Sequence, residues 1–463
     1  MLNEPGWEAR MPSEQGNLKS SHAGLERLIA LLARGQANDY VGEPVSQLEH
    51  ALQAAFLARR AGASESEVIA ALCHDIGHWC DPESPQMSEL GTVEHEKIGQ
   101  CYLKRLGMAD EVADLVAMHV DAKRYQAAVR PRYFDKLSDA SMATLVYQGG
   151  VMRSEEIEKF EQHPMFDSVL RLRAWDEAAK VPDATVDGLE TYRALLARNV
   201  RAPLEEADLL HWKARGWLHI KGWLDEKEIL SLRLESDRMQ AWPDVQGRWM
   251  KYYETASESR RLLCRLENFL QYSRRFDQVC RGFAVLNLME QLFGEPAFLF
   301  KEKINFKLPG GGGFSPHQDA PAFTTFEQRY HVTAMLSLDA TTKENGCLEI
   351  ADWTRSRELL DTASDLTLTD RVCDEMKWQS ILTQPGDLLV FDSYVPHRSS
   401  ANRSEHPRRV LYSTYSSAAD GDLRDHYFER KRALFPPDIE RQPGQSYESG
   451  IYNVGNPISV SSV

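Results

Sequence analysis

The spacing of apolar residues divides the chain into two different parts. From Leu18 to about Asn199, apolar positions recur every three or four residues, as in the stretches VSQLEHALQAAFLARRAG and DEVADLVAMHVDAKRY. This is the period of an amphipathic helix, and strand-like alternation is nearly absent from these residues. The pattern predicts that the first part of the chain is all-α.

The pattern changes at the segment ARNVRAPLEEADLL, in which Pro203 and the acidic residues behind it are typical of the start of a new helix. Beyond a short α region, runs that favour strands alternate with Gly, Pro and Asn. These runs are AFLFKEKINFKLPG, RYHVTAMLSLDA, NGCLEI, QPGDLLVFDSY and RRVLYSTYSS. We therefore expect a boundary near residues 200–206, a helical domain over residues 18–200 and a β-rich domain over residues 207–440.

Composition narrows the class of protein. The 463 residues are enough for two or three domains, and 54 Lys and Arg against 69 Asp and Glu give a net charge of −15. An acidic chain is a poor partner for nucleic acid or an anionic membrane surface. No apolar run approaches the ~18 residues that span a bilayer, and the polar start MLNEPGWEARMPSEQG lacks the profile of a signal peptide. We expect a cytoplasmic protein, and nothing in the sequence indicates its oligomeric state.

Histidines in the helical part stand where metal ligands are expected. The chain has 14 histidines. His74 and Asp75 are adjacent in ALCHDIGHW, a segment that we expect to be a buried helix, where an unpaired carboxylate costs several kcal/mol. Other helical segments supply the candidates His50, His95, His119 and Asp176. Each alone is more typical of an ordinary core or surface residue, but facing helices that each deliver a His or an Asp form the di-metal centres of helical bundles.

The order of these residues resembles that of the HD-domain superfamily, and specifically its mixed-valent diiron oxygenases. The segments YVGEPVSQLEHALQAAFLA, CHDIGH, HVDAKRY, LSDASMATLVYQGG and RAWDEAAK carry the resemblance, which covers residues 25–195 and is strongest to members that cleave 1-hydroxy-2-aminoethylphosphonate. It implies a diiron centre, with Asp75 bridging the two irons. The implied ligands are His50, His74, Asp75, His95, His119 and Asp176. Imidazole and carboxylate ligands suit iron, although by type alone they also admit manganese or zinc.

Three further side chains are candidates for binding a phosphonate. Lys123 lies one helical turn after His119, and Arg173 lies three residues before Asp176, so each pair can face one pocket. With Ser141 they would make a cationic, hydrogen-bonding cradle, in which Arg matches the geometry of a phosphonate. A solvent-exposed helix face is the alternative for a Lys or Arg without the ligand pattern.

The same resemblance implies roles for three residues near the ligands. His78, one turn after His74, would act as a base near the substrate. Tyr40 and Glu43 precede the His50 segment and match a pair that gates the substrate in the family. Glu43 is equally typical of an acid that stabilises a helix N-terminus.

The β-rich part contains a second pattern typical of a metal site. His317 and Asp319 are two residues apart, so on an extended strand both face one side. His397 follows an apolar strand far downstream, and two histidines with one carboxylate form the facial triad of non-haem Fe(II) oxygenases. Arg408, eleven residues later, is placed to pair with a dicarboxylate, and Ser399 is placed to join it.

This part resembles the phytanoyl-CoA dioxygenase family of 2-oxoglutarate-dependent hydroxylases over residues 207–430. The resemblance rests on the motif HQD, the strand NGCLEI, the PGD turn and the spacing of H-x-S, N-x-S and Arg after it. It implies a double-stranded β-helix, or jelly roll, with flanking helices, a mononuclear Fe(II), 2-oxoglutarate as co-substrate and O2. Within the family, FKEKINFKLPGGGGFSPHQD is most similar to hydroxylases of 2-aminoethylphosphonate.

Two questions about this second site stay open at the level of the sequence. Arg409 stands beside Arg408 and is an alternative partner for the co-substrate. Along the strand KEKINFKLP, the alternating residues Lys303, Asn305 and Lys307 either face solvent or line the site, where they would bind an anion.

Two oxygenase modules in one chain make most sense as consecutive steps. The C-terminal domain would hydroxylate 2-aminoethylphosphonate next to phosphorus with 2-oxoglutarate and O2. The N-terminal diiron domain would then cleave the C–P bond of the product to glycine and phosphate. One alternative keeps this chemistry on an N-methylated aminoethylphosphonate, which gives glycine betaine from the trimethyl compound. A second joins an HD nucleotide phosphohydrolase to an unrelated hydroxylase, and a third treats the helical part as a non-catalytic sensor or scaffold.

Overall fold

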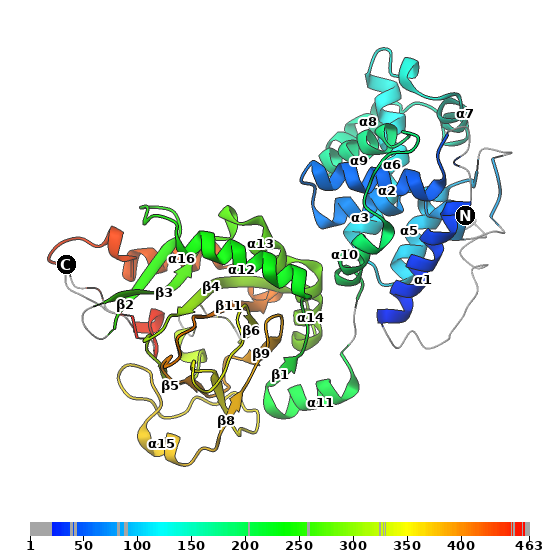
Figure 1. The fold of residues 1–463 in the computed structure, drawn as a ribbon. Coiled ribbons are helices and arrows are strands. Elements are labelled where there is room, and N and C mark those ends of the chain that lie inside the picture. The colour runs from blue at the N-terminus through cyan, green and yellow to red at the C-terminus, as the bar shows by residue number, and fades with distance from the viewer. Residues whose placement is uncertain are drawn as a thin grey trace. The chain divides into compact units, whose positions relative to one another are not determined.

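The chain folds into two compact units, residues 1–203 and 204–463 (Figure 1). The computed structural model describes residues 21–37, 40, 44–80, 84–87, 91–201, 204–256, 260–323, 326, 328, 330–445, 447, 450–455 and 457–458. The first unit is built from helices and the second around two β-sheets. This confirms the predicted class, an all-α N-terminal part and a β-rich C-terminal part with flanking helices.

The N-terminal unit is a helical bundle around a buried polar centre. Its helices are α1 (Ser21–Arg34), α2 (Gln47–Arg60), α3 (Glu65–Cys73), α4 (Gly77–Cys80), α5 (His95–Arg105), α6 (Asp110–Val129), α7 (Asp139–Tyr147), α8 (Ser154–Glu161), α9 (Phe166–Ala178) and α10 (Arg193–Arg198). Helices α2, α3, α6 and α9 pack against one another, and α5 packs on α4 and α6. Each of these elements carries or adjoins one of the predicted metal ligands.

Capping residues fix where the ligand-bearing helices begin. Ser46 precedes α2, where its hydroxyl accepts from the Glu49 amide at 3.2 Å and the Glu49 carboxylate accepts from the Ser46 amide at 2.7 Å. Ser64 and Glu67 form the same reciprocal pair before α3. These capping boxes satisfy amides that a helix end leaves unpaired. They set the register that directs His50, in the first turn and a half of α2, into the bundle.

The His74–Asp75 pair does not lie inside a helix, contrary to our expectation. Helix α3 ends at Cys73, His74 is its C-cap residue, and the pair sits on the turn between α3 and α4. The reason is a close approach: a Cβ on Gly77 would lie 1.8 Å from the carbonyl oxygen of His95. Because Gly77 has no side chain, the turn packs directly against the start of α5, which brings Asp75 within reach of His95.

We predict that Gly77→Ala destabilises the N-terminal unit. The added methyl group meets backbone atoms that cannot move aside, and overpacking of this kind costs about 1–3 kcal/mol or more. Gly188→Ala is the matched control, since Gly188 has an ordinary φ of −75° and open space around its Cβ position. Thermal unfolding of the full chain should show a lowered transition for Gly77→Ala alone; equal transitions for the two variants would contradict the packing argument.

The C-terminal unit is a jelly roll of two antiparallel sheets. The larger has the order β1-β9-β6-β11-β4-β3-β2 and the smaller the order β5-β10-β7-β8. The strands are β1 (Trp217–Ile220), β2 (Met250–Thr255), β3 (Arg261–Glu267), β4 (Ala297–Lys307), β5 (Phe314–His317), β6 (His331–Ser337), β7 (Leu348–Ala351), β8 (Trp378–Ile381), β9 (Leu388–Asp392), β10 (His397–Ser399) and β11 (Arg408–Ser417). The flanking helices are α11 (Glu206–Arg215), α12 (Glu226–Gln240), α13 (Arg274–Arg281), α14 (Phe283–Phe293), α15 (Asp370–Asp374) and α16 (Arg424–Leu434). The strands β4, β6, β7, β9 and β11 lie within the five runs predicted as strands or within a residue of them.

The two faces of the larger sheet bury different residues. One face packs on α12, α13 and α14 (Figure 1), with Ile304 and Phe306 of β4 and Leu411 of β11 in that core. The opposite face packs on the smaller sheet through residues such as Val410 and Tyr412. Because side chains alternate along a strand, the odd-numbered residues of β4 from 301 to 307 fall on the face toward the smaller sheet, which we call the inner face.

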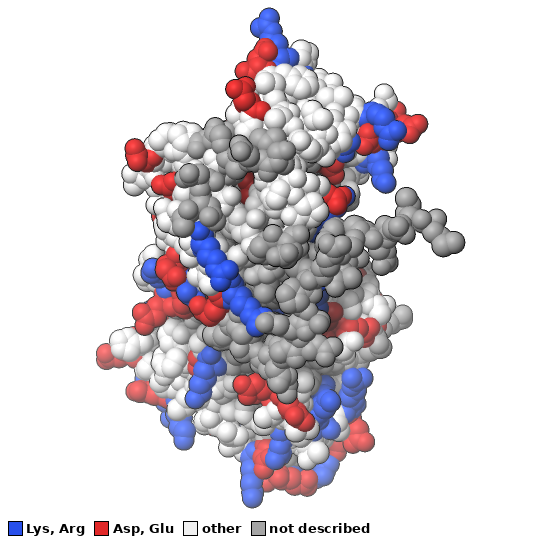
Figure 2. Space-filling view, turned by 90° about the vertical axis from the view of Figure 1, so that its right-hand side faces the viewer, with Lys and Arg blue, Asp and Glu red and all other residues white. Residues whose placement is uncertain are grey.

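Charges on the surface are mixed. On the face drawn in Figure 2, Lys and Arg side chains are interspersed with Asp and Glu rather than gathered into one basic area. This agrees with the net charge of −15 in giving no support to a polyanion as partner. None of the helices in the described ranges has the length and apolarity that crossing a membrane requires.

Candidate active sites

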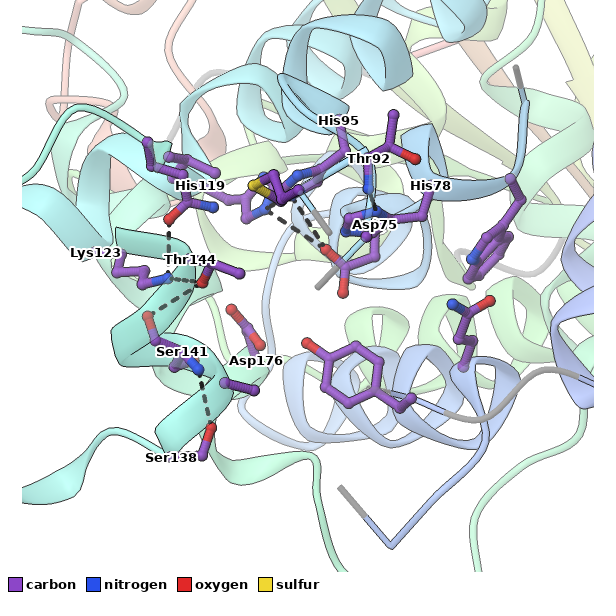
Figure 3. Close-up of a pocket in the computed structure, with 18 of the residues that line it drawn as sticks. Asp75, His78, Thr92, His95, His119, Lys123, Ser138, Ser141, Thr144 and Asp176 are labelled. Carbon is purple, nitrogen blue, oxygen red and sulfur yellow. Dashed lines mark hydrogen bonds and ion pairs between the residues drawn. The ribbon is translucent and has the colours of Figure 1, made fainter. Parts of the chain in front are cut away.

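A pocket of about 600 Å³ opens into the N-terminal bundle. Side chains of α2, the α3–α4 turn, α4, α5, α6, α7 and α9 line it, and they include most of the predicted ligands (Figure 3). Imidazoles and carboxylates gather on one side, and Lys123, Ser141 and Thr144 lie on another. The pocket therefore joins a candidate metal centre to a cationic, hydroxyl-lined wall.

His50 and His74 form the first pair of candidate ligands. The His50 Nδ1 atom lies 2.8 Å from the carbonyl oxygen of Ala179, and His74 Nδ1 lies 2.9 Å from that of Ala71. Each Nδ1 therefore carries a proton, and the two Nε2 atoms, 3.0 Å apart, present lone pairs to each other. Two facing lone pairs repel unless a cation lies between them, so the pair fits a metal ion. Asp176 Oδ1, 3.4 Å from His50 Nε2, adds a carboxylate to this set.

His95 and His119 form the second pair. Their Nε2 atoms are 3.1 Å apart, and His119 Nδ1 donates to the carbonyl oxygen of Val116 at 2.6 Å. The same argument applies to His119, because its proton is held at Nδ1 and its Nε2 lone pair points into the centre. Both imidazoles are almost fully buried, and burial lowers the pKa of His119 to about 4 and that of His95 well below its usual value. Neutral imidazole is the form that binds metals.

Asp75 lies between the two pairs. Its Oδ2 is 3.3 Å from His74 Nε2, and its Oδ1 is 3.5 Å from His95 Nε2 and 3.7 Å from His119 Nε2 (Figure 3). Burial raises the pKa of Asp75, but the neighbouring imidazoles, His74 first, hold it well below its usual range. One ionised carboxylate thus offers an oxygen to each pair. The donor set fits two metal ions that share Asp75, one with His50, His74 and Asp176 and the other with His95 and His119.

His78 lies beside the second pair but is held in a different way. Its ring stacks on that of His95 with centroids 4.0 Å apart, and its Nδ1 accepts from the Thr92 amide at 2.9 Å. In neutral His78 the proton is therefore at Nε2, and burial, named first among the causes, lowers the pKa of the ring. A ring nitrogen of His78 lies within 4.8 Å of ligand atoms of Asp75 and His95. We assign His119 rather than His78 as a ligand, because a protonated Nε2 donates a hydrogen bond instead of binding a metal.

Lys123 anchors the cationic wall of the pocket. Its ammonium donates to Thr144 Oγ1 at 2.7 Å and to Gln148 Oε1 at 2.8 Å, both on α7. Burial, followed by the charge of Arg173, lowers the pKa of Lys123 to about 7. Ser141 lies in the first turn of the same helix, where unpaired amides and the helix dipole favour an anion. The wall is thus suited to a ligand with a negative charge.

Arg173 lines the pocket but is already paired. Its Nη1 lies 2.6 Å from Asp176 Oδ2, and its Nε lies 2.8 Å from Glu177 Oε1 and 3.1 Å from the Tyr133 hydroxyl. Burial raises the pKa of Asp176, and Arg173 leads the charges that hold it well below the usual value. The guanidinium therefore orients the carboxylate of a candidate ligand in addition to facing the pocket.

The predicted gating pair is described only in part. Tyr40 stacks on the His50 ring with centroids 4.1 Å apart, and it lines the pocket. The ammonium of Lys180 lies 5.6 Å from the centroid of the Tyr40 ring. Glu43 lies outside the described residues, so its predicted role stays a prediction.

The candidate triad of the C-terminal unit lies where β5 meets β10. His317 and His397 are direct partners in the ladder, and their ring centroids are 4.3 Å apart. His317 Nδ1 donates to the carbonyl oxygen of Ser315 at 2.7 Å, and His397 Nδ1 to that of Val395 at 3.0 Å. Both Nε2 atoms are left as acceptors, and Asp319 Oδ1 lies 3.7 Å from that of His317. Ligand atoms of all three residues lie within 4.8 Å of one another.

Asp319 reaches the triad by a turn rather than by strand alternation. Strand β5 ends at His317, and Asp319 has helical backbone angles as the N-cap of the short 3-10 helix Ala320–Ala322. The expectation that both residues share one extended strand is wrong, because the chain turns here. Burial raises the pKa of Asp319, but His397, His317 and nearby lysines lower it to about 2, so the carboxylate is ionised.

The structure separates Arg408 from Arg409. Arg409 donates to Asp339 at 2.8 Å and also pairs with Asp237, so its charge is compensated. Arg408 is 1% exposed and faces the inner side, where its Nη2 lies 3.5 Å from the Tyr412 hydroxyl and its Nε has no partner among the described residues. A buried guanidinium in this state fits an anionic ligand. Spacing along the chain also favours Arg408.

Ser399, the second residue predicted for the co-substrate, contacts a lysine. Lys307 donates to Ser399 Oγ at 2.8 Å and to the carbonyl oxygen of Ser400 at 2.6 Å. Lys307 is also the direct β-ladder partner of Arg408. Burial, followed by the charge of Arg408, lowers the pKa of Lys307 to about 6. Lys307 thus belongs to the inner row that the sequence left open between solvent and site.

Sequence reasoning missed several residues of the N-terminal pocket. Thr144 and Gln148 hold Lys123, and Thr92 holds His78. Thr144 follows Ser141 by three residues and precedes Gln148 by four, so the period of α7 could have indicated that they share a face. No comparable signal marks Thr92, which lies in a loop.

Comparison with known families gives two matches in this chain. A model described as "Phytanoyl-CoA dioxygenase (PhyH)" matches residues 212–410, and the HD domain matches residues 48–148. The first match contains the candidate triad and Arg408, and the second contains five of the six candidate ligands of the bundle, all except Asp176.

Curated relatives match large parts of their own length. The chain is 44% identical over 250 residues to a 2-aminoethylphosphonate dioxygenase from Uncultured bacterium HF130_AEPn_1, a match that covers 53% of this chain and 95% of the relative. It is 39% identical over 160 residues to a [1-hydroxy-2-(trimethylamino)ethyl]phosphonate dioxygenase (glycine-betaine-forming) from Leisingera caerulea, covering 34% and 81%. A hydroxymethylphosphonate dioxygenase from Gimesia maris is 38% identical over 171 residues, covering 36% and 85%. The chain therefore belongs to the phytanoyl-CoA dioxygenase family and is an oxidoreductase that also carries an HD domain.

Proposed function

We propose that the chain is a bifunctional enzyme of oxidative phosphonate catabolism. The C-terminal unit converts 2-aminoethylphosphonate, 2-oxoglutarate and O2 to 1-hydroxy-2-aminoethylphosphonate, succinate and CO2. The N-terminal unit converts that product and a second O2 to glycine and phosphate. The names of the relatives support both halves of the proposal, since one is a 2-aminoethylphosphonate dioxygenase and another acts on a 1-hydroxylated aminoalkylphosphonate.

The observation that carries the proposal is the position of Asp75 between two pairs of imidazoles. One carboxylate oxygen faces His50 and His74, and the other faces His95 and His119. This arrangement supports a pair of metal ions that share a ligand, which suits a redox centre acting on O2 and substrate together.

In the C-terminal unit the protein's own residues hold the two substrates. We propose that His317, Asp319 and His397 bind iron, which supplies activation of O2 and hydroxylation of a C–H bond. Arg408 would bind a carboxylate of 2-oxoglutarate through its free donors. Lys307 fixes the Ser399 hydroxyl beside it. The apolar inner core around Val410 and Tyr412 would keep water from the reacting carbon.

In the N-terminal unit we propose that iron bound to the six ligands supplies oxidation at the carbon that carries phosphorus. Lys123 and the start of α7 would hold the phosphonate, because burial makes charge-assisted hydrogen bonds strong. His78 would donate its Nε2 proton to an oxygen of the substrate, unless the Thr92 hydrogen bond breaks and frees the ring to act as a base. Arg173 would keep Asp176 in place.

Lys123 makes the N-terminal activity sensitive to pH. A lysine whose pKa is about 7 loses its charge as the pH rises through 7, so affinity for the hydroxyphosphonate should fall relative to a variant whose cation stays charged. Lys123→Arg supplies that cation. We expect the ratio of wild-type KM to variant KM to rise between about pH 6 and about pH 9. A constant ratio in steady-state phosphate release would show that Lys123 does not titrate against the substrate.

The same chemistry on an N-methylated substrate is the second candidate. Tyr40 and Trp79 line the pocket, and aromatic rings attract quaternary ammonium groups. A relative named for the trimethylamino compound supports it further. Kinetics with 2-aminoethylphosphonate and its N-trimethyl derivative, run side by side, decide between the substrates by kcat/KM.

Two other classes make different predictions. An HD phosphohydrolase beside an unrelated hydroxylase would release phosphate from nucleotides without O2 or 2-oxoglutarate. A sensor or scaffold would bind a ligand in the bundle without turnover. The buried pair His95 and His119 favours the oxygenase, because a phosphohydrolase needs only the shorter H…HD…D set.

The proposal is tested with purified chain, Fe(II), 2-oxoglutarate, ascorbate, O2 and 2-aminoethylphosphonate. We expect succinate, glycine and phosphate. His50→Ala should abolish phosphate release and keep succinate formation, and His397→Ala should abolish succinate formation but still release phosphate from added 1-hydroxy-2-aminoethylphosphonate. Survival of both activities in either variant would show that the site assignment is wrong.

A further inference from the structure

The inner face of the larger sheet carries more cations than a 2-oxoglutarate site needs. Lys301, Lys303 and Lys307 alternate along β4. Arg265 of β3 is the ladder partner of Asn305 of β4 and so lies on the same face. Arg408 of β11 completes the set opposite Lys307. Five cationic side chains on one inward face call for more than one small anion.

These cations fall into two groups along β4. Lys307 and Arg408 are direct partners at one end of the ladder. Lys303 and Lys301 lie four and six residues away, which at about 3.3 Å per residue is roughly 13–20 Å of strand. Arg265 lies near them, because its neighbour Glu267 pairs with Lys303. We call Arg265, Lys301 and Lys303 the second cation group.

The second group is short of negative charge. Among the described residues, no carboxylate lies within salt-bridge distance of Lys301 or Lys303. Their ammonium groups lie over aromatic rings instead, 4.5 Å from the Phe323 centroid and 5.1 Å from that of Tyr412. Burial leads the causes that lower the pKa of both lysines, so nearby anions would be needed to keep them charged.

Arg265 does not have a full counter-ion either. It is 4% exposed, and its Nη1 lies 3.2 Å from Glu267 Oε1. Glu267 is shared, because its other oxygen lies 2.5 Å from the ammonium of Lys431. The Arg265 Nε atom is buried and has no hydrogen-bond partner among the described residues. A buried donor of this kind is costly unless a ligand satisfies it.

The group lies toward the metal triad. The charges of Lys303 and Lys301 act on Asp319, together with those of His397 and His317, against the effect of burial. Phe323, on which Lys301 stacks, follows Asp319 by four residues through the Ala320–Ala322 turn. An anion bound by these cations would therefore sit near the triad, at a place separate from Arg408.

We propose that Arg265, Lys301 and Lys303 bind the phosphonate group of the substrate in the C-terminal unit and select phosphonates over carboxylates. The inference rests on the proposed function. A phosphonate has three oxygens and up to two negative charges, and it matches three cationic donors, whereas a carboxylate offers two oxygens and one charge. Hydroxylation next to phosphorus also requires the phosphonate to lie one bond from the reacting carbon, close to the metal.

The test compares KM values for succinate formation in the full chain. We expect Lys303→Met and Lys301→Met each to raise the KM for 2-aminoethylphosphonate about 30-fold or more, while the KM for 2-oxoglutarate changes less than about threefold. Lys307→Met should do the reverse. Lys303→Arg should restore most of the affinity. Lys227→Met, on the exposed start of α12, controls for loss of one positive charge and should leave both KM values unchanged.

Selectivity supplies a second readout. β-Alanine has the amine and chain length of the substrate with a carboxylate in place of the phosphonate. Its inhibition constant relative to the phosphonate KM should shift toward β-alanine in Lys303→Met, and binding of both compounds can be followed by calorimetry under anaerobic conditions. If Lys303→Met does not fold, Lys301→Met and Lys303→Arg carry the same comparison.

The outcomes separate the inference from the function on which it rests. If the wild type forms no succinate with 2-aminoethylphosphonate, the proposed function is wrong. If it does, and the KM for the phosphonate is unchanged in Lys301→Met and Lys303→Met, only the assignment of the second cation group is overturned.

Discussion

Asp75→Asn is expected to empty the paired metal site of the bundle while the third metal stays bound. The amide keeps the shape of the side chain but loses its charge, and one of its two oxygens becomes an NH2 group. Both oxygens of Asp75 face imidazole pairs, so neither metal keeps its full set. We expect metal content to fall from about three to about one per chain. Phosphate release should fall by at least about 1,000-fold, with succinate formation within about twofold of the wild type.

A matched control is Asp114→Asn. Asp114 lies on α6, the helix of His119, but it is partly exposed and pairs with Lys104 at 2.8 Å. Its replacement should leave both activities and the metal content unchanged. A fall in succinate formation in Asp75→Asn would contradict the separation of the two sites, and full metal content would contradict the bridging role.

Arg408→Gln is expected to weaken binding of 2-oxoglutarate without weakening the fold. Loss of a buried partner of an ionised ligand costs about 2–5 kcal/mol, which corresponds to roughly 100-fold or more in KM. In the chain without ligand, Arg408 has only the Tyr412 hydroxyl as a printed partner at 3.5 Å. Removal of an uncompensated buried charge should therefore leave thermal stability equal or higher.

The readout is thermal unfolding with and without 2-oxoglutarate, together with KM. The wild type should gain stability on adding the co-substrate and the variant should not, because ligands stabilise only the state that binds them. Arg398→Gln is the control, since Arg398 lies beside His397 but pairs with Glu349 at 2.8 Å. An unchanged co-substrate KM in Arg408→Gln would return the role to another cation, with Lys307 the first candidate.

The identity of the elements could be predicted from the sequence, but their ends could not. The helical period of VSQLEHALQAAFLARRAG and the strand pattern of RRVLYSTYSS correspond to α2 and β11. The turn at His74 and Asp75 was not predictable, because it depends on contact between Gly77 and His95, which are 18 residues apart in the sequence. Asp319 left its expected strand for a similar reason, since the turn after His317 is set by how β5 packs.

The candidate ligands could be picked out from the sequence, but their partners could not. Nothing in the sequence states that His50 faces His74 and His95 faces His119, because the bundle alone decides which helices meet. Arg408 and Arg409 show the same limit. Alternation predicts opposite faces for them, but only the structure reveals that Asp339 and Asp237 occupy Arg409.

The central claim is that one chain holds a paired metal centre and a separate mononuclear one. The most direct measurement is iron content per folded chain after anaerobic reconstitution with Fe(II) and removal of excess metal. The account predicts about three irons per chain, two of them lost in Asp75→Asn and one lost in His397→Ala. About one iron per chain in the wild type, unaffected by Asp75→Asn, would contradict it.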